Sequence, residues 1–136
     1  MNAIREVDGR LAWVGFPTPE PGPGEVRIRV RATAVNRADL VQRAGHYPPP
    51  PGAPDTLGLE CAGVIDAIGP DVTGRAVGDE VVALLAGGGY AEQVCCPASH
   101  TLPRPSGLSW AESAAVMEVF ATAATNLLVK GGLVAG

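Results

Sequence analysis

The chain has 136 residues, of which 46% are hydrophobic and 18% charged, and its net charge is −4. This is the size and balance of one globular domain with a buried core, which excludes a disordered segment. Its 10 basic residues form no run, which excludes a basic patch for a nucleic-acid partner. There is no apolar run of about 18 residues and no secretory signal at the start, so we expect no membrane partner and a cytoplasmic location.

The 18 glycines and 13 prolines separate short apolar segments, a pattern typical of turns in a β-rich domain. The chain has 3 cysteines, and adjacent residues on a strand point to opposite faces, so Cys95 and Cys96 cannot share one metal ion. We predict no disulfide framework and interpret Cys61, Cys95 and Cys96 as small buried side chains in a reducing compartment.

The first predicted strand covers residues 26–34, where apolar and polar residues alternate. This alternation predicts one buried face, and it places Arg27, Arg29 and Arg31 on an exposed, solvated face.

A short helix is predicted over residues 36–44, with Leu40, Val41 and Ala44 on one apolar face. Gly45 ends it, because glycine is favoured just past a helix end. An extended, exposed loop of four prolines follows.

Three more strands are predicted over residues 61–68, 80–85 and 91–96. The glycine triplet at 87–89 is interpreted as a hairpin turn, because the Lys and Ser or Thr of a phosphate-binding loop do not follow it. Short strands at this spacing are typical of a partly open barrel.

The last third of the chain changes to a helical period. Ser109 and Glu112 form a capping-box pattern that opens an Ala-rich helix, and a second helical stretch is predicted over 121–129. His46 and His100 lie beside proline-containing segments without other metal-ligand residues around them, so both are interpreted as loop residues.

Several motifs occur in an order that resembles the zinc-independent, zeta-crystallin-like quinone oxidoreductases of the medium-chain dehydrogenase/reductase superfamily. Each motif alone is weak, but the ordered set spans nearly the whole chain. The motifs are Ala34–Asp39 (AVNRAD), Arg43–Pro48 (RAGHYP), Gly58–Val64 (GLECAGV), Val77–Val81 (VGDEV) and Gly88–Glu92 (GGYAE).

This resemblance implies a β-rich α+β fold, namely a GroES-like, partly open β-barrel with appended helices. Residues 1–120 would be the catalytic, substrate-binding domain, and residues 121–136 the start of the connection to a Rossmann domain. That second domain binds NADPH in the family, and no Gly-x-Gly-x-x-Gly turn after a strand occurs in this sequence. We therefore expect residues 1–136 alone to hold NADPH weakly and to show no reductase activity.

By the same resemblance, Asn36 and Leu59 occupy positions where zinc alcohol dehydrogenases have a Cys and a His ligand, so no metal is expected. A quinone or enone accepts a hydride and delocalises the charge itself, whereas an alcohol or simple aldehyde needs a Lewis acid. The resemblance therefore favours a quinone or an α,β-unsaturated carbonyl as substrate.

The resemblance also assigns the site residues. Asn36 would face the nicotinamide or substrate, Tyr47 would wall the pocket, and Thr122 would reach the nicotinamide ribose or carboxamide. Structural alternatives are open: Asn36 as a helix cap, Tyr47 as a cover of the proline loop, and Thr122 bonded within its own helix. Glu60 is expected to have a structural role at the cleft floor, and Cys61 to be a packing residue.

We predict that the chain is the catalytic part of an NADPH-dependent quinone oxidoreductase that transfers hydride without a metal. The full-length enzyme is expected to be a homodimer. Two alternatives are a zinc-free enoyl reductase of the polyketide or fatty-acid type, and a non-catalytic barrel that acts as a binding module.

Overall fold

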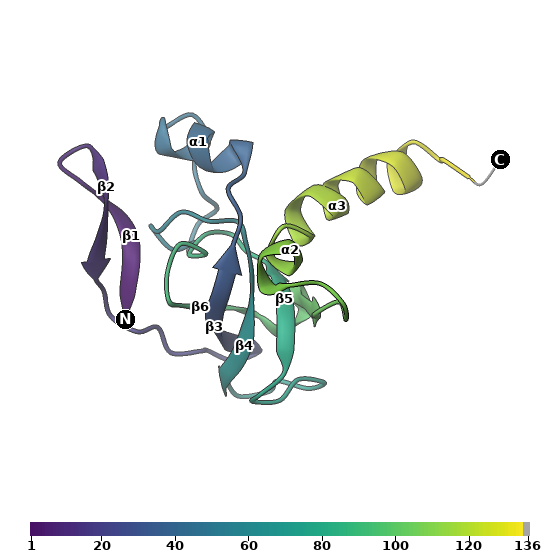
Figure 1. Ribbon diagram of the computed structural model, residues 1–136, viewed down its shortest axis with the longest axis horizontal. Helices are drawn as coiled ribbons and strands as arrows, with labels where there is room; N and C mark the ends of the chain where they lie inside the picture. Colours follow the sequence, from purple (N-terminus) through teal and green to yellow (C-terminus); the bar gives the residue numbers. More distant parts are fainter. Residues whose placement is uncertain (135–136) are drawn as a thin grey trace.

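The computed structural model describes residues 1–134, which form two antiparallel sheets and a few helices (Figure 1). A two-stranded sheet comes first, followed by a five-stranded sheet in the order β6-β3-β4-β5-β7. The strands are β1 (Asn2–Val7), β2 (Arg10–Gly15), β3 (Glu25–Thr33), β4 (Glu60–Ile68), β5 (Glu80–Leu84), β6 (Gln93–Pro97) and β7 (Thr101–Pro103).

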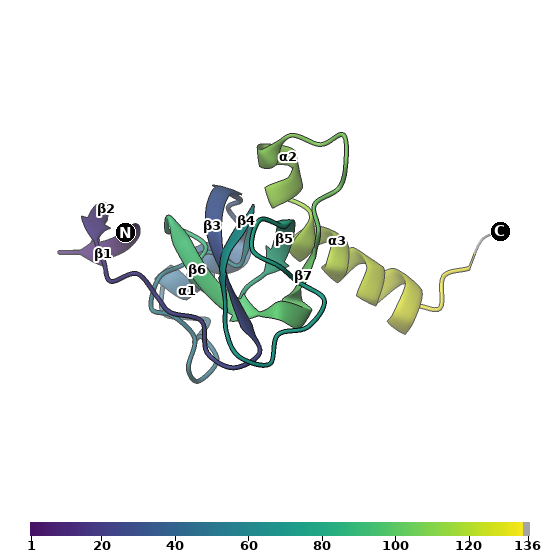
Figure 2. The same cartoon turned by 90° about the horizontal axis from the view of Figure 1, so that it is seen from below.

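One helix lies between β3 and β4, a short turn lies between β6 and β7, and the remaining helices follow β7. They are α1 (Arg37–Arg43), the 3-10 turn η1 (Ala98–His100), α2 (Trp110–Ala114), α3 (Met117–Ala124) and the π-helical η2 (Thr125–Lys130). Figure 2 shows α2 beside the sheet and α3 running away from it toward the C-terminus. None of the helices within residues 1–134 is long and apolar enough to cross a bilayer.

Side-chain alternation on the central strands divides the core between the two faces of the large sheet. Cys61 and Ile65 of β4 belong to the main cluster, whereas Ala62 between them packs with Val82 and Ala114 under α2. Successive residues of a strand point to opposite faces, so a strand with apolar residues at every position is buried on both sides. The β-rich fold with appended helices is confirmed, and the large sheet is open, with β6 and β7 at its edges.

The predicted strands agree with β3, β4, β5 and β6 to within two residues at each end. The β1–β2 hairpin was not predicted, although its turn carries a strong signal. Asp8 and Gly9 both have positive φ, at 48° and 75°, as a two-residue hairpin turn requires. The short strand β7 was also missed, because three residues are too few to show a period.

The expectation of a solvated arginine row is wrong for Arg27. Its side chain is only 16% exposed, and its Nε donates to Asp66 Oδ1 at 2.7 Å. A second bond, from Nη1 to Glu20 Oε1 at 3.1 Å, ties the strand to the proline-rich segment before it. These partners raise the pKa of Arg27, the bond to Asp66 being the largest cause. Arg29 and Arg31 are exposed as expected.

The glycine triplet is not a hairpin turn, because β5 and β6 are not neighbours in the sheet. It is instead a buried crossover that packs on residues 54–58. Gly88 N–H donates to Thr56 O at 2.6 Å and Gly89 N–H donates to Gly58 O at 3.0 Å. A Cβ at Gly88 would lie 2.8 Å from Val94 Cγ2, so close packing explains this glycine.

The cysteine and helix expectations hold in part. All three cysteines are free, and Cys61 and Cys96 are buried, but Cys95 is only half-buried.

In α1 the buried residue is Asp39, while Leu40 is 56% exposed, so the prediction of an apolar face on this helix was wrong. The second C-terminal helix begins at Met117, four residues earlier than predicted, and both histidines are exposed.

Candidate functional site

The N-terminus of α1 is held by a buried carboxylate. Asp39 is 1% exposed, and its Oδ2 accepts hydrogen bonds from Asn36 N–H at 2.7 Å and from the Tyr90 hydroxyl at 2.9 Å. Its other oxygen, Oδ1, is buried without a hydrogen-bond partner in the described structure. Burial and the bond to Asp39 raise the pKa of Tyr90, so its hydroxyl stays a proton donor.

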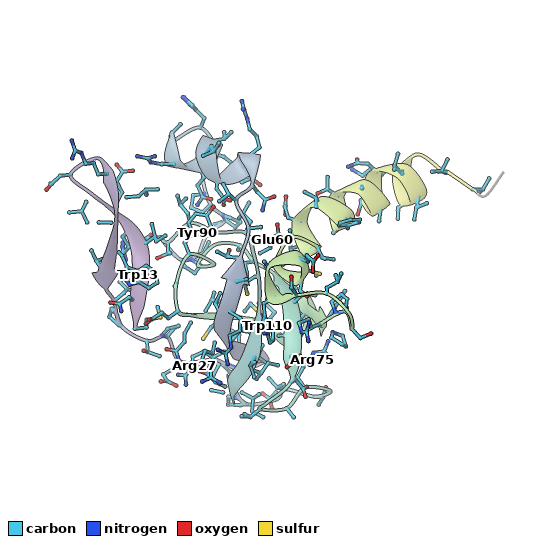
Figure 3. The ribbon with its side chains drawn as sticks, viewed as in Figure 1. Trp13, Arg27, Glu60, Arg75, Tyr90 and Trp110 are labelled. Atoms are coloured by element: carbon cyan, nitrogen blue, oxygen red, sulfur yellow. The ribbon has the colours of Figure 1, made fainter. Side chains whose placement is uncertain are left out.

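A second buried carboxylate joins three elements of the fold. Glu60, the first residue of β4, is 1% exposed. Its Oε1 accepts from Asn36 Nδ2 at 2.8 Å, and its Oε2 accepts from the backbone N–H of Glu118 at 2.9 Å. Figure 3 shows Glu60 at the end of the sheet, between α1 and the start of α3. The carboxylate therefore fixes the spacing between these two helices.

An open cleft of about 700 Å³ lies where α1 faces α3 and η2. Its wall combines apolar side chains with a few polar groups, the character of a site that binds a flat organic ring. The lining residues are Asn36, Arg37, Ala38, Val41, Tyr47, Glu118, Val119, Thr122, Ala123, Asn126 and Leu127.

All three residues that the sequence singled out line this one cleft. Asn36 precedes α1, Tyr47 follows it, and Thr122 comes from α3, so the fold brings together residues from two distant parts of the chain. Tyr47 is 50% exposed. Asn36 and Asp39 form a capping box at the start of α1, and the amide group of the Asn36 side chain also donates to Glu60. The roles of these residues toward a ligand stay predictions.

Sequence reasoning missed Glu118. It lines the cleft one helical turn before Thr122 and two turns before Asn126, and this spacing of four was the available signal. Burial raises the pKa of the Glu118 carboxyl, and the nearby carboxylates Glu60 and Asp39 raise it further. Within residues 1–134 no ion pair or hydrogen bond engages its side chain.

The residues at the expected metal positions offer no metal-binding cluster. Leu59 is 8% exposed and has no donor atom, and no group of three His, Cys, Asp or Glu side chains in the described part of the chain is placed to hold an ion. Burial raises the pKa of the Cys61 thiol, two residues after Leu59, far above its ordinary value, so this thiol is a packing residue and not a reactive one.

Comparison with known proteins agrees with this architecture. The sequence profile described as "Alcohol dehydrogenase GroES-like domain" matches residues 22–106. The chain belongs to this family. The resemblance to the medium-chain dehydrogenase/reductase superfamily is thereby confirmed, as is the GroES-like fold.

Relatives of this GroES-like domain carry different names. The "Synaptic vesicle membrane protein VAT-1 homolog" of Danio rerio is 43% identical over 99 residues, which are 73% of this chain and 20% of that protein. The structure of a mycobacterial quinone oxidoreductase has a TM-score of 0.80 and 36% identity, covering 93% of this chain and 40% of that one. A CurK enoyl reductase structure has a TM-score of 0.84 and 28% identity, with 94% and 42% covered.

The GroES-like domain is thus much shorter than its relatives. It spans 20% of the Danio rerio protein, 40% of the quinone oxidoreductase chain and 42% of the enoyl reductase chain. Because the chain spans only part of these proteins, its activity is a matter for proposal.

Proposed function

We propose that this domain is the acceptor-binding half of an NADPH-dependent quinone oxidoreductase that works without zinc. The observation that carries the proposal is the convergence of Asn36, Tyr47 and Thr122 on one open cleft lined mainly by apolar side chains. Further support comes from the similar mycobacterial quinone oxidoreductase and from a mycobacterial relative, 36% identical to this chain, whose structure is described as complexed with NADPH.

The residues of the cleft fit the nicotinamide end of such a cofactor. An aromatic ring, a hydroxyl and a carboxamide are suited to stack against and hydrogen bond a flat ring that carries an amide, and Tyr47, Thr122 and Asn36 supply these groups. The sequence contains no Gly-x-Gly-x-x-Gly turn for the pyrophosphate, so another domain would bind that part. When bound, NADPH supplies the hydride.

Glu60 orients the Asn36 carboxamide within this proposal. A carboxylate only accepts hydrogen bonds, so the Asn36 amide must turn its NH₂ group toward Glu60. The carbonyl oxygen faces the backbone N–H of Asp39 in the capping box and keeps a second lone pair for an N–H or O–H of the bound ring. Because Glu60 is buried and also holds α3, the position of this acceptor is fixed before a ligand arrives.

The substrate class is inferred from Asn36 and Leu59, which stand where zinc alcohol dehydrogenases have metal ligands. The Asn36 amide is hydrogen bonded to Glu60, and Leu59 has no lone pair for a metal ion. These two residues therefore do not form a metal site that could stabilise an alkoxide. A quinone needs none, because its ring delocalises the added charge. The apolar walls formed by Val41, Val119 and Leu127 suit such a ring.

An enoyl reductase is the second candidate. It is favoured by the CurK enoyl reductase structure and by a mycobacterial phthioceranic/hydroxyphthioceranic acid synthase that is 42% identical over 92 residues, 68% of this chain. An enoyl thioester is also a conjugated acceptor, so the same cleft would serve it. A long acyl chain would have to leave through the open side of the cleft.

A panel of acceptors tests the proposal. The protein with its nucleotide-binding domain is assayed for NADPH oxidation with 1,4-benzoquinone, crotonyl thioester and ethanal, before and after dialysis against a chelator. We expect benzoquinone to be reduced with the highest kcat/KM, and the rate to survive the chelator. Preference for the crotonyl thioester would favour the enoyl reductase, and loss of activity on chelation with recovery on added zinc would contradict the zinc-free assignment.

A further inference from the structure

Reduction of a quinone to a neutral hydroquinone needs a proton in addition to the hydride. A quinone that gains a hydride becomes a hydroquinone monoanion, with one phenolate oxygen still to be protonated. A group in the cleft that carries a proton at neutral pH would complete the reaction without waiting for water. Among the described lining residues, Glu118 has a carboxyl group, which in its acid form can donate a proton to a phenolate oxygen.

Glu118 has the placement that this role requires. It lines the cleft on the same face of α3 as Thr122 and shares the Glu60 carboxylate with Asn36, through its own backbone N–H. It therefore lies beside Asn36 and Thr122, two of the three residues that we assign to the nicotinamide. Its carboxyl is free of ion pairs and hydrogen bonds within residues 1–134, so it is available to a ligand.

We propose that Glu118 is the proton donor of this cleft. The inference rests on the proposed function, which supplies the acceptor and the hydride. In the step, the O–H bond of the Glu118 carboxyl breaks and a new O–H bond forms on the phenolate oxygen of the reduced acceptor. The acceptor has gained two electrons from the hydride and leaves as a neutral hydroquinone. Glu118 remains as a carboxylate and regains its proton from water through the open cleft.

The surroundings of Glu118 keep it in its acid form to higher pH than a surface glutamate. Burial disfavours its charged form, and the carboxylates of Glu60 from β4 and Asp39 from α1 add like charge. The other titratable or charged residues of the cleft are Arg37 and Tyr47, and no ion pair in residues 1–134 joins Arg37 to Glu118. The donor is therefore active at low pH and lost as pH rises through its raised pKa.

The kinetic test compares wild type, Glu118→Gln and the control Glu6→Gln, each with the nucleotide-binding domain present. Glu6 lies on β1 outside the cleft, with a 52% exposed side chain. General acid catalysis contributes about 10²-fold or more, so Glu118→Gln should lower kcat for benzoquinone by about 10²-fold. Its KM should change little, and the alkaline limb of the wild-type kcat profile should disappear. Glu6→Gln should match wild type.

Retention of kcat within about threefold in Glu118→Gln would overturn the proposal, as would a lowered kcat that keeps the wild-type alkaline limb. If wild type itself fails to reduce benzoquinone, the proposed function is wrong and the donor role falls with it. A readout independent of activity is the carboxyl ¹³C NMR titration of the 136-residue chain. The Glu118 midpoint should lie above the ordinary value of a glutamate carboxyl, and a midpoint at or below that value would contradict the donor.

Discussion

Asn36 and Glu60 form a hydrogen bond of 2.8 Å that links the start of α1 to the first residue of β4. The bond places a carboxamide at the edge of the cleft and leaves the other Glu60 oxygen to hold the first turn of α3. One buried carboxylate therefore determines how far apart the two walls of the cleft lie.

Replacing Glu60 by Gln should destabilise the fold. A glutamine offers one acceptor oxygen where two donors, from Asn36 and Glu118, now have one carboxylate oxygen each. A buried donor left without an acceptor costs about 1–3 kcal/mol. Urea unfolding at neutral pH should show a loss of this size for Glu60→Gln. Glu6→Gln, the same change on an exposed side chain, should stay within about 0.5 kcal/mol of wild type. Equal stabilities of the two variants would contradict the bridging role.

Tyr90→Phe tests the hydrogen bond from Tyr90 to Asp39, which holds the N-terminus of α1. The variant removes the hydroxyl that donates to Asp39 Oδ2, and this carboxylate already has one buried oxygen without a partner. We expect a loss of about 1–3 kcal/mol in the free energy of unfolding. The matched control is Tyr47→Phe, since Tyr47 is half exposed and should change by less than about 0.5 kcal/mol. A loss in Tyr47→Phe as large as that in Tyr90→Phe would show that the tyrosine effect is not specific to Asp39.

Gly63→Ala tests the closeness of the central strands. A Cβ at Gly63 would lie 2.3 Å from Arg29 O and 2.6 Å from Ile28 Cγ2, both on the neighbouring strand β3. Because backbone must move to admit it, we expect a loss of at least about 2 kcal/mol. Gly15→Ala is the control, because its added Cβ would meet nothing within 4 Å. Thermal melts of both variants check this, and a melting temperature near wild type for Gly63→Ala would refute the close approach.

The raised pKa of Glu118 predicts a pH-dependent stability difference. Its pKa lies above the ordinary value of 4.5, so the folded state binds its proton more tightly than the unfolded state. The stabilisation is present at low pH and is lost as pH rises through the folded-state pKa. Glu118→Gln carries no such proton, so its stability relative to wild type should increase from acidic to neutral pH, by less than about 1 kcal/mol. Urea unfolding at several pH values measures the difference, and a constant difference would contradict the shift.

The sequence predicted four strands of the large sheet and the short helix after the first of them, because alternation and glycine positions are local signals. It could not predict that Arg27 is paired, since Asp66 lies on another strand and reaches Arg27 only through the β3–β4 register. The crossover at Gly87–Gly89 was mistaken for a hairpin for the same reason. A local sequence pattern does not show which strands pair in the sheet.

The candidate site shows the same division. Asn36, Tyr47 and Thr122 were selected through family motifs, and they line one cleft in the structure. Glu118 was missed because no motif marks it. Its raised pKa arises from burial and from Glu60 and Asp39, which are distant in sequence. A residue whose chemistry depends on neighbours from other elements becomes visible only when the fold is known.

The most direct test of the central claim, that this cleft binds the nicotinamide and the acceptor, is the Tyr47→Ala variant. Its kcat for benzoquinone should fall at least about tenfold, because the ring that walls the cleft is lost. Affinity for the adenosine end of the cofactor should be unchanged, and stability should stay within about 1 kcal/mol since Tyr47 is 50% exposed. Steady-state kinetics read beside a melting curve decide the matter. Unchanged catalytic constants would remove Tyr47 from the site and contradict the account.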